Sequence, residues 1–292
     1  MDGKTILITG ASSGFGLLAA EILAGRGHDV IAGVRGGVQR LRRIIREEGL
    51  PALAEAERAG RLAVLDLHMD RPGTFASVEK HLDSSRGSGL DVLVNNAGFG
   101  LMGPVELHTA EELRRQLEVN FFGPVLLTQR LLPRLKKTKG RVLSVTSVAG
   151  RMAVPFMGSY CASKNALESY MEALRYDMEP FGVRVGLIEP GRFKTVFSKN
   201  ATFGERALSP DSGYYERIES FRRARKGMFG RVTADPMTVA RLIVRLCEAP
   251  RVPLRTLVGL DARAGALLKR ILPDSLRAGL TRILSDWLVF KS

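Results

Sequence analysis

A glycine-rich turn between an apolar run and a helical pattern constrains the fold of this chain more than any other feature. The run KTILIT at 4–9 has the composition of a buried strand, and LLAAEILAGRG at 17–27 has helical spacing. Glycines let a backbone approach a pyrophosphate, and a helix N-terminus offers it free N–H groups. This order predicts a dinucleotide-binding βαβ unit, with an ordinary turn as the alternative. The residues expected around the pyrophosphate are Gly10, Ser12, Ser13, Gly14, Phe15 and Gly16.

The alternation of strands and helices continues along the chain. Helical patterns separate further apolar runs of strand length, which begin at His28, Arg61, Leu90, Arg141, Val183 and Arg255. We therefore expect one domain over residues 1–292 with a Rossmann-type α/β fold: a doubly wound, mostly parallel seven-stranded sheet with helices on both faces. Residues 192–230 are predicted to form a substrate lid, because long loops commonly do. Residues 263–292 are predicted to form a C-terminal amphipathic extension.

The end of the second predicted strand bears on the choice of cofactor. A carboxylate there usually binds the adenosine ribose of NAD, whereas a nearby arginine accommodates the 2′-phosphate of NADP. Here the strand ends in Gly33-Val34-Arg35. NADP(H) is therefore favoured, and NAD(H) is the alternative if Arg35 is merely exposed. The other residues expected at the cofactor are Asp66 and Leu67 near the adenine, and Asn96, Ala97 and Gly98 after the fourth strand.

Tyr160 and Lys164 lie four residues apart in the helical pattern YCASKNALESYMEAL, so their side chains share one helix face. A free tyrosine has a pKa of about 10, and lowering it by about three units requires about 4 kcal/mol in favour of the phenolate. One ammonium about 4 Å away supplies roughly that amount at an effective dielectric of about 20. Tyr160 is therefore predicted to act as a general acid/base near neutral pH. Ser147, at the carboxyl end of RVLSVTS, would face the same reacting oxygen, and a chance YxxxK spacing is the alternative.

Asn120 is a second polar residue in an unexpected place. Thr109 and Glu112 form a capping box that opens a long helical pattern, and Asn120 lies inside it, before two phenylalanines. A buried amide needs hydrogen-bond partners. We expect Asn120 either to bend the helix and hold a water leading toward Lys164, or to be satisfied by the backbone.

The composition limits the partners and the compartment. The net charge of +14 indicates an anionic partner such as a phosphorylated cofactor or an acidic lipid surface, and an arginine-rich soluble protein is the alternative. The basic clusters lack interleaved aromatic residues, so no nucleic-acid partner is expected. Two unpatterned cysteines and four scattered histidines predict neither a disulfide framework nor a metal site. The N-terminal residues enter a strand directly, which favours a cytoplasmic protein without a signal peptide.

The last residues, SLRAGLTRILSDWLVF, carry an apolar stripe that comprises Leu280, Ile283, Leu284, Trp287 and Leu288. We expect this stripe to pack on the chain itself, with peripheral contact to an acidic membrane as the alternative.

The motifs together resemble those of the short-chain dehydrogenase/reductase family over nearly the whole chain. They are TGASSGFG at 9–16, NNAG at 95–98, Asn120, Ser147, YCASK at 160–164 and PG at 190–191. Within the family, the insert after the second strand, Val34-Arg35, GLMGPVE and SYCASKNALES are most similar to the branch of 17β-hydroxysteroid dehydrogenase type 1 and photoreceptor-type retinol dehydrogenase.

The resemblance implies a role for each matched residue. Tyr160 would exchange a proton with a carbonyl or an alcohol, and Ser147 would hydrogen-bond the substrate oxygen. Lys164 would bind the nicotinamide ribose, and Asn120 would hold a relay water. Pro190, Gly191 and Thr195 would bind the cofactor, although Lys194 stands where many members have an apolar residue.

The function expected is therefore NADP(H)-dependent interconversion of a carbonyl and an alcohol on a lipophilic substrate, which could be steroid-, retinoid-, long-chain- or polyketide-like. The alternatives are an NAD-dependent alcohol dehydrogenase and a non-catalytic dinucleotide-binding sensor or scaffold. From the resemblance, a homodimer or homotetramer is expected through the helices at 109–137 and 158–181.

Overall fold

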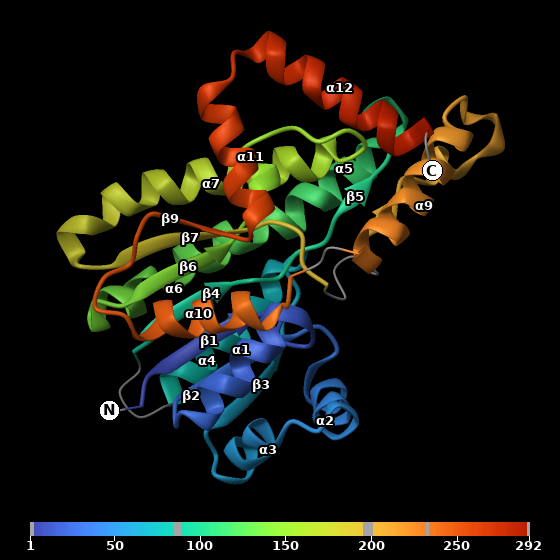
Figure 1. The fold of residues 1–292 in the computed structure, drawn as a ribbon. Helices are drawn as coiled ribbons and strands as arrows, with labels where there is room; N and C mark the ends of the chain where they lie inside the picture. The colour runs from blue at the N-terminus through green and yellow to red at the C-terminus, as the bar shows by residue number, and fades with distance from the viewer. Residues whose placement is uncertain (1–2, 85–88, 195–200, 232–233, 291–292) are drawn as a thin grey trace.

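The structure, a computed structural model, describes residues 3–84, 89–194, 201–231 and 234–290 (Figure 1). Its centre is a seven-stranded sheet of order β3-β2-β1-β4-β6-β7-β9, and every neighbouring pair is parallel. The predicted α/β fold is confirmed. The strands are β1 Thr5–Thr9, β2 Asp29–Val34, β3 Leu62–Asp66, β4 Val92–Asn95, β6 Arg141–Val145, β7 Arg184–Pro190 and β9 Arg255–Val258.

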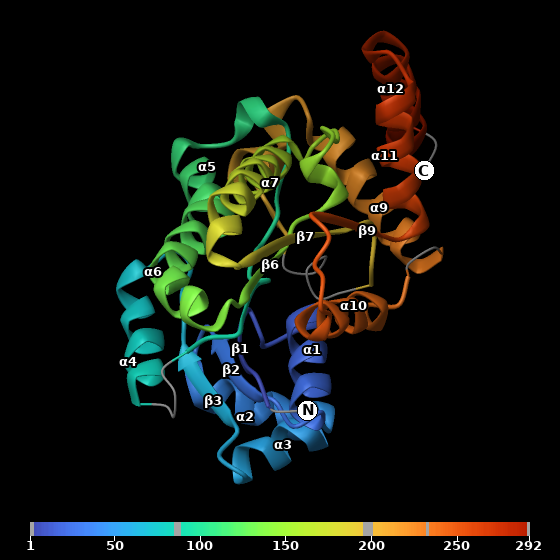
Figure 2. The ribbon, with the colours of Figure 1, turned by 90° about the vertical axis from the view of Figure 1, so that its left-hand side faces the viewer.

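Helices cover both faces of this sheet (Figure 2). One hydrophobic core lies under α1, α2, α3 and α10, and a second lies under α4, α6 and α7. The central strands are buried along nearly their whole length because both faces are covered. The helices are α1 Gly14–Gly25, α2 Gly37–Glu48, α3 Pro51–Arg58, α4 Ala76–Ser84, α5 Ala110–Leu117, α6 Gly123–Thr138, α7 Gly158–Met178, α9 Tyr215–Arg231, α10 Met237–Glu248, α11 Leu260–Ile271 and α12 Asp274–Phe290.

The strand order changes direction between β1 and β4, which are direct neighbours. The chain builds outward to β3 on one side of this point and to β9 on the other. In open α/β sheets, the carboxyl ends of the strands at such a switch point border the ligand crevice. The glycine turn after β1 and the NNAG segment after β4 both lie there, so the fold brings together two motifs that are far apart in the sequence.

Three segments differ from the sequence-based expectation. The long helix at 109–137 is divided into α5 and α6 by a π-helical turn, Glu118–Phe122. The predicted loop at 192–230 contains the helix α9 and the short strand β8, Thr202–Phe203, which pairs with β5, Leu101–Met102. The predicted extension is two helices, α11 and α12, and the far end of α12 returns to α9 (Figure 1).

Candidate functional site

Thr9, the last residue of β1, fixes the glycine turn against the segment that follows β4. Its hydroxyl oxygen accepts hydrogen bonds from the backbone N–H groups of Asn96 and Ala97, each at 3.0 Å. The Asn96 side chain in turn donates to the carbonyl oxygens of Thr9 and Gly10, at 3.0 and 3.2 Å. This role of Thr9 could not be predicted, because a threonine that ends a strand gives no local signal of such contacts.

Two of the predicted glycines are required by close packing. Gly10 has φ +66°, and a Cβ there would lie 2.9 Å from the Ala97 Cα. A Cβ on Gly16 would lie 2.4 Å from the Asn96 Nδ2. The turn therefore leads into α1 with its backbone held close to the strand ends. Ser13 precedes α1 with extended backbone, and among the described residues its hydroxyl caps no helix amide. The first amides of α1 and the hydroxyl of Ser13 are thus available to a phosphate.

Two arginines lie near the carboxyl end of β2, Arg35 directly after the strand and Arg40 in α2. Arg35 is exposed, and the half-buried Arg40 donates from its Nη1 to the Arg35 carbonyl oxygen at 3.1 Å. Asp66 accepts from the Gly36 N–H at 2.8 Å, so its carboxylate holds the turn after β2. Leu67 is buried beneath Gly33. The position of Arg40 beside Arg35 depends on the turn at Gly36, so it could not be predicted from the sequence.

Ser147 and Tyr160 meet at the carboxyl end of β6. The hydroxyl of Ser147 donates to the carbonyl oxygen of Pro190 at 3.4 Å and accepts from the Ala149 N–H at 3.2 Å. Its side chain also forms a hydrogen bond with the Tyr160 phenol. Tyr160 is buried with Cys161 and Ala149. The two residues predicted to face one reacting oxygen are therefore neighbours, although twelve residues separate them in the chain.

Lys164 lies on the same face of α7 as Tyr160. Its Nζ is 6.0 Å from the centre of the Tyr160 ring and donates to the Val145 carbonyl oxygen at 3.0 Å. A Cβ on Gly98 would lie 3.5 Å from this Nζ and 3.2 Å from the Asn120 Oδ1. Lys164, Asn120 and the NNAG segment therefore converge at one point.

Burial controls the ionisation of this pair. It raises the pKa of the Tyr160 phenol above its usual range, and the hydrogen bond with Ser147 opposes only part of that rise. Burial also lowers the pKa of the Lys164 ammonium to about 8. The predicted lowering of the Tyr160 pKa is therefore wrong here, because desolvation of the buried phenol outweighs the hydrogen bond that favours the phenolate. Tyr160 holds its proton at neutral pH.

Asn120 lies in the π-helical turn between α5 and α6. Its Oδ1 accepts from the Phe99 N–H at 3.1 Å, and its Nδ2 donates to the Phe99 carbonyl oxygen at 2.9 Å and to Ser163 at 3.1 Å. The predicted interruption of the helix is confirmed, and the amide is satisfied largely by the backbone. A role in holding a water stays a prediction.

Asp261, in the first turn of α11, positions the Pro190-Gly191 segment. Its carboxylate accepts from the Arg192 N–H at 2.7 Å, and a Cβ on Gly191 would lie 2.1 Å from its Oδ1. Only glycine therefore fits beside this carboxylate. Asp261 is far away in the sequence, so its contact could not be predicted. Thr195, the last predicted cofactor residue, lies outside the described residues.

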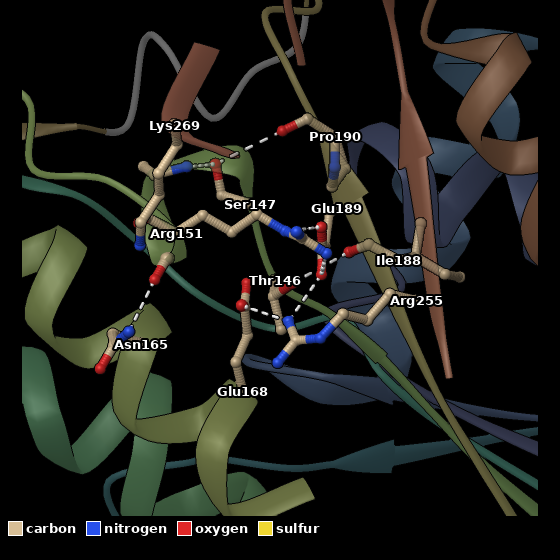
Figure 3. Close-up of polar contacts among 12 residues, drawn as sticks. Thr146, Ser147, Arg151, Asn165, Glu168, Ile188, Glu189, Pro190, Arg255 and Lys269 are labelled. Atoms are coloured by element: carbon tan, nitrogen blue, oxygen red, sulfur yellow. Dashed lines mark hydrogen bonds and ion pairs between the residues drawn. The ribbon is translucent and has the colours of Figure 1, made fainter. Parts of the chain in front are cut away.

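A buried ionic cluster surrounds Glu168 and Glu189, between α7, β7 and β9 (Figure 3). Arg255 of β9 contacts Glu168 at 2.7 Å, Glu172 at 2.6 Å and Glu189 at 2.8 Å. Arg151 contacts the second oxygen of Glu189 at 2.5 Å. Glu189 and Glu168 are 0% and 2% exposed. The cluster ties β7 and β9 to α7 one turn beyond Lys164, and no local sequence pattern indicates it.

An apolar cavity of about 480 Å³ lies beside the Tyr160 helix. Its walls include Val105, Val154, Pro155 and Phe156. Val154 also packs against the buried cluster that contains Tyr160. Phe156 has φ +59°, a left-handed conformation that costs a bulky residue of the order of 1–3 kcal/mol and is concentrated at functional sites. Its ring lies 5.3 Å from that of Phe221 on α9.

Comparison with known proteins agrees with this architecture. The family model described as short chain dehydrogenase matches residues 4–205. The chain is 33% identical over 287 residues to a 3-ketodihydrosphingosine reductase of Bacteroides thetaiotaomicron, covering 97% of this chain and 98% of the relative. It is 40% identical over 192 residues to retinol dehydrogenase 5 of Mus musculus, covering 65% of this chain and 57% of that protein. This similarity is consistent with the predicted branch.

A solved structure leads to the same conclusion. A short-chain dehydrogenase from Streptomyces avermitilis has 32% sequence identity and a TM-score of 0.78, with 96% of each chain covered. The chain therefore belongs to the short-chain dehydrogenase/reductase family, whose members are oxidoreductases that bind a nicotinamide dinucleotide.

Proposed function

We propose that this enzyme is an NADP(H)-dependent reductase of a carbonyl group on a lipophilic substrate. The observation that carries the proposal is the hydrogen-bonded pair of Ser147 and Tyr160, with the Lys164 Nζ 6.0 Å from the Tyr160 ring, at the carboxyl end of the sheet. The bound cofactor supplies a hydride to the carbonyl carbon. Ser147 orients the carbonyl oxygen, and Tyr160 gives that oxygen its phenolic proton, so that an alcohol forms.

The protonation state of the pair is the one that reduction requires. A phenol whose pKa is raised by burial keeps its proton at neutral pH, and a general acid must hold a proton before it can donate one. Lys164, with a pKa of about 8, keeps its positive charge there as well and favours the phenolate that remains after transfer. Solvent then restores the proton of Tyr160.

The residues around the glycine turn fit the proposed cofactor. Gly10 and Gly16 leave room that a Cβ would fill, and Ser13 precedes the helix whose N-terminus would receive a phosphate. Arg35 and Arg40 would hold the 2′-phosphate of NADP, and Lys164 would hold the nicotinamide ribose. Two adjacent arginines support NADP(H) more strongly than Arg35 alone.

Replacing Arg35 and Arg40 together with alanine is expected to remove the preference for NADPH over NADH. Each guanidinium would lose a charge-assisted contact with the 2′-phosphate, so NADPH should bind about tenfold more weakly, which corresponds to about 1.4 kcal/mol. NADH, which lacks that phosphate, should bind as before. Titration followed by nicotinamide fluorescence measures both affinities.

The control for this experiment is Arg42→Ala. Arg42 is also on α2, but it pairs with Glu57 at 2.6 Å, away from the turn. Its loss should leave both affinities unchanged. Equal binding of NADH and NADPH by the unmodified enzyme would contradict the cofactor assignment and favour an NAD-dependent alcohol dehydrogenase. Failure to bind either would favour the scaffold alternative.

The lipophilic substrate is proposed from the apolar cavity at the start of the Tyr160 helix, where Val154 packs on the cluster that contains Tyr160. Its walls combine the 153–158 loop with Val105 from the β5 side. The helix α9 and the residue before it border the same space: Tyr214 donates a hydrogen bond to Glu106, and Phe221 of α9 packs on Phe156. We assign the proposed lid function to α9 and the turns that precede it. Phe193, in contrast, is buried against Phe15 and belongs to the core.

The arm formed by α11 and α12 is proposed to contact an acidic membrane surface. Exposed apolar side chains on it are Leu260, Leu267, Leu268, Ile271, Leu276, Leu280 and Ile283. They alternate with lysine and arginine, the pattern of interfacial helices. No helix in the described ranges is long and apolar enough to cross a bilayer. Flotation with vesicles of anionic, but not of neutral, lipid is expected, and equal flotation with both would contradict this contact.

The predicted homodimer or homotetramer stays a prediction. The helices α5, α6 and α7 expected at its interface expose Leu113 and Tyr176, and Phe122 is exposed between α5 and α6. Light scattering of the purified protein measures its mass in solution. A monomeric mass would contradict the predicted homodimer or homotetramer.

A further inference from the structure

A second, basic cavity adjoins the apolar cavity at the start of the Tyr160 helix. It has a volume of about 560 Å³ and lies between the segment after Ser147 and the arm formed by α11 and α12. Ala153, Pro155 and Thr281 line both cavities, so the two spaces lie side by side with these residues between them. Apolar side chains mainly line the apolar cavity, whereas charged side chains make up half of the lining of the basic cavity.

Positive charge dominates the basic cavity. Its charged lining residues are Arg151, Lys269, Arg277, Arg282 and Asp274. Four cations thus face one carboxylate. Arg277 is paired with Asp274 at 2.7 Å, and Arg151 is paired with the buried Glu189. Arg282 is exposed and, within the described ranges, forms no ion pair. Among the residues that the structure describes, Lys269 donates only to a neutral carbonyl oxygen, that of Arg151 (Figure 3).

Such a cavity favours an anion. Like charges held together repel one another, and a negative group placed among them removes that repulsion and gains charge-assisted hydrogen bonds. Arg151 is four residues from Ser147, so the basic cavity begins close to the proposed reaction site. A ligand whose carbonyl reached Ser147 and whose body filled the apolar cavity would have its far end beside these cations.

We infer that the basic cavity binds an anionic group of the substrate, which is therefore an amphiphile: a carbonyl compound with a hydrocarbon body and a terminal carboxylate, sulfate or phosphate. This inference rests on the proposed reductase function and narrows its substrate class. Arg277, Arg282 and Lys269 determine specificity, whereas Ser147 and Tyr160 act on the carbonyl.

The test compares (ω−1)-keto fatty acids of increasing length with their methyl esters. NADPH is the reductant, and no vesicles are present. The double variant Arg277→Gln/Arg282→Gln should raise KM for the acids about tenfold, which corresponds to about 1.4 kcal/mol, and leave kcat unchanged. The esters should show no change. The matched control is Arg263→Gln/Arg270→Gln, which removes the same charge from exposed positions of α11 that do not line the cavity.

A binding measurement separates this inference from the reductase function. Calorimetry with octanoate and octanol needs no turnover. The unmodified enzyme should bind octanoate more tightly than octanol, and Arg277→Gln/Arg282→Gln should remove the difference. If ketones are not reduced but this difference appears, the reductase proposal fails and the anion site stands.

Two results would overturn the inference. One is equal KM values for acids and esters together with equal affinity for octanoate and octanol, while the ketones are still reduced. The other is a double variant that loses flotation with anionic vesicles but binds octanoate as the unmodified enzyme does. In that case, the cations serve the membrane contact alone.

Discussion

Tyr160→Phe is expected to lower kcat about a thousandfold, because a positioned general acid contributes about 100- to 10,000-fold. The change removes only the phenolic oxygen, and the ring keeps its place beside Cys161 and Ala149 in the buried cluster. Affinity for NADPH should therefore stay within about twofold, since a loss of one contact at an unchanged pocket costs little. Single-turnover kinetics with saturating NADPH measure the chemical step directly.

The matched control is Tyr170→Phe on the same helix. The hydroxyl of Tyr170 accepts a hydrogen bond from Gln129 at 2.8 Å and lies on the side of α7 that faces α6. Its loss should leave kcat unchanged. A Tyr160→Phe enzyme that reduces ketones at the unmodified rate would show that another group, or water, supplies the proton.

Arg255→Met is expected to lower the free energy of unfolding by about 3 kcal/mol, the lower part of the range for breaking a buried ion pair. Arg255 bridges three carboxylates, and two of them, Glu168 and Glu189, are almost fully buried. Arg151 still neutralises Glu189 in the variant, which limits the loss. Denaturant unfolding of the purified protein measures the change.

The loss should depend on pH. Burial and the neighbouring Glu189 already raise the pKa of Glu168 above its ordinary 4.5, although Arg255 opposes this rise. Without Arg255, the folded-state pKa rises further, so the folded protein binds a proton that the unfolded chain releases. Stability then falls as pH rises above about 4.5 and up to the folded-state pKa. The free energy of unfolding that Arg255→Met loses relative to the unmodified protein should therefore be smaller in mild acid than at alkaline pH.

Two variants serve as references. Arg263→Met removes an exposed arginine of α11 and should change stability by less than about 0.5 kcal/mol. Arg255→Met/Glu168→Met removes both partners and should recover part of the loss, since an unpaired buried charge no longer remains. If Arg255→Met unfolds at the same denaturant concentration as the unmodified protein at every pH, the cluster contributes no stability.

The features that could be predicted from the sequence are those set by local spacing. The four-residue interval between Tyr160 and Lys164 places both side chains on one helix face. The βαβ unit could be predicted because a glycine-rich turn links a strand to a helix. The alternation of apolar runs and helical patterns was sufficient to predict the seven-stranded parallel sheet. Asn120 is an unusual residue for the interior of a helix. The structure explains its presence, because it lies in a π-helical turn.

The features that could not be predicted depend on contacts between distant segments. Asp261 meets Gly191, and Arg255 meets Glu168, only because β9 joins the sheet beside β7. The ionisation of Tyr160 was mispredicted for a related reason: the charge of Lys164 was counted, but the depth of burial was not visible in the sequence. The helix α9 was missed because its polar, basic composition is typical of a loop.

The central claim is that hydride passes from NADPH to a carbonyl carbon at the site formed by Ser147, Tyr160 and Lys164. Its most direct test uses NADPH that carries deuterium at both hydrogen positions of the nicotinamide C4. The substrate is a lipophilic ketone, and mass spectrometry of the alcohol detects the label. The account predicts one deuterium on the carbinol carbon with the unmodified enzyme and a near-complete loss of this product with Tyr160→Phe. Binding of NADPH without any transfer of deuterium to a carbonyl compound would contradict it.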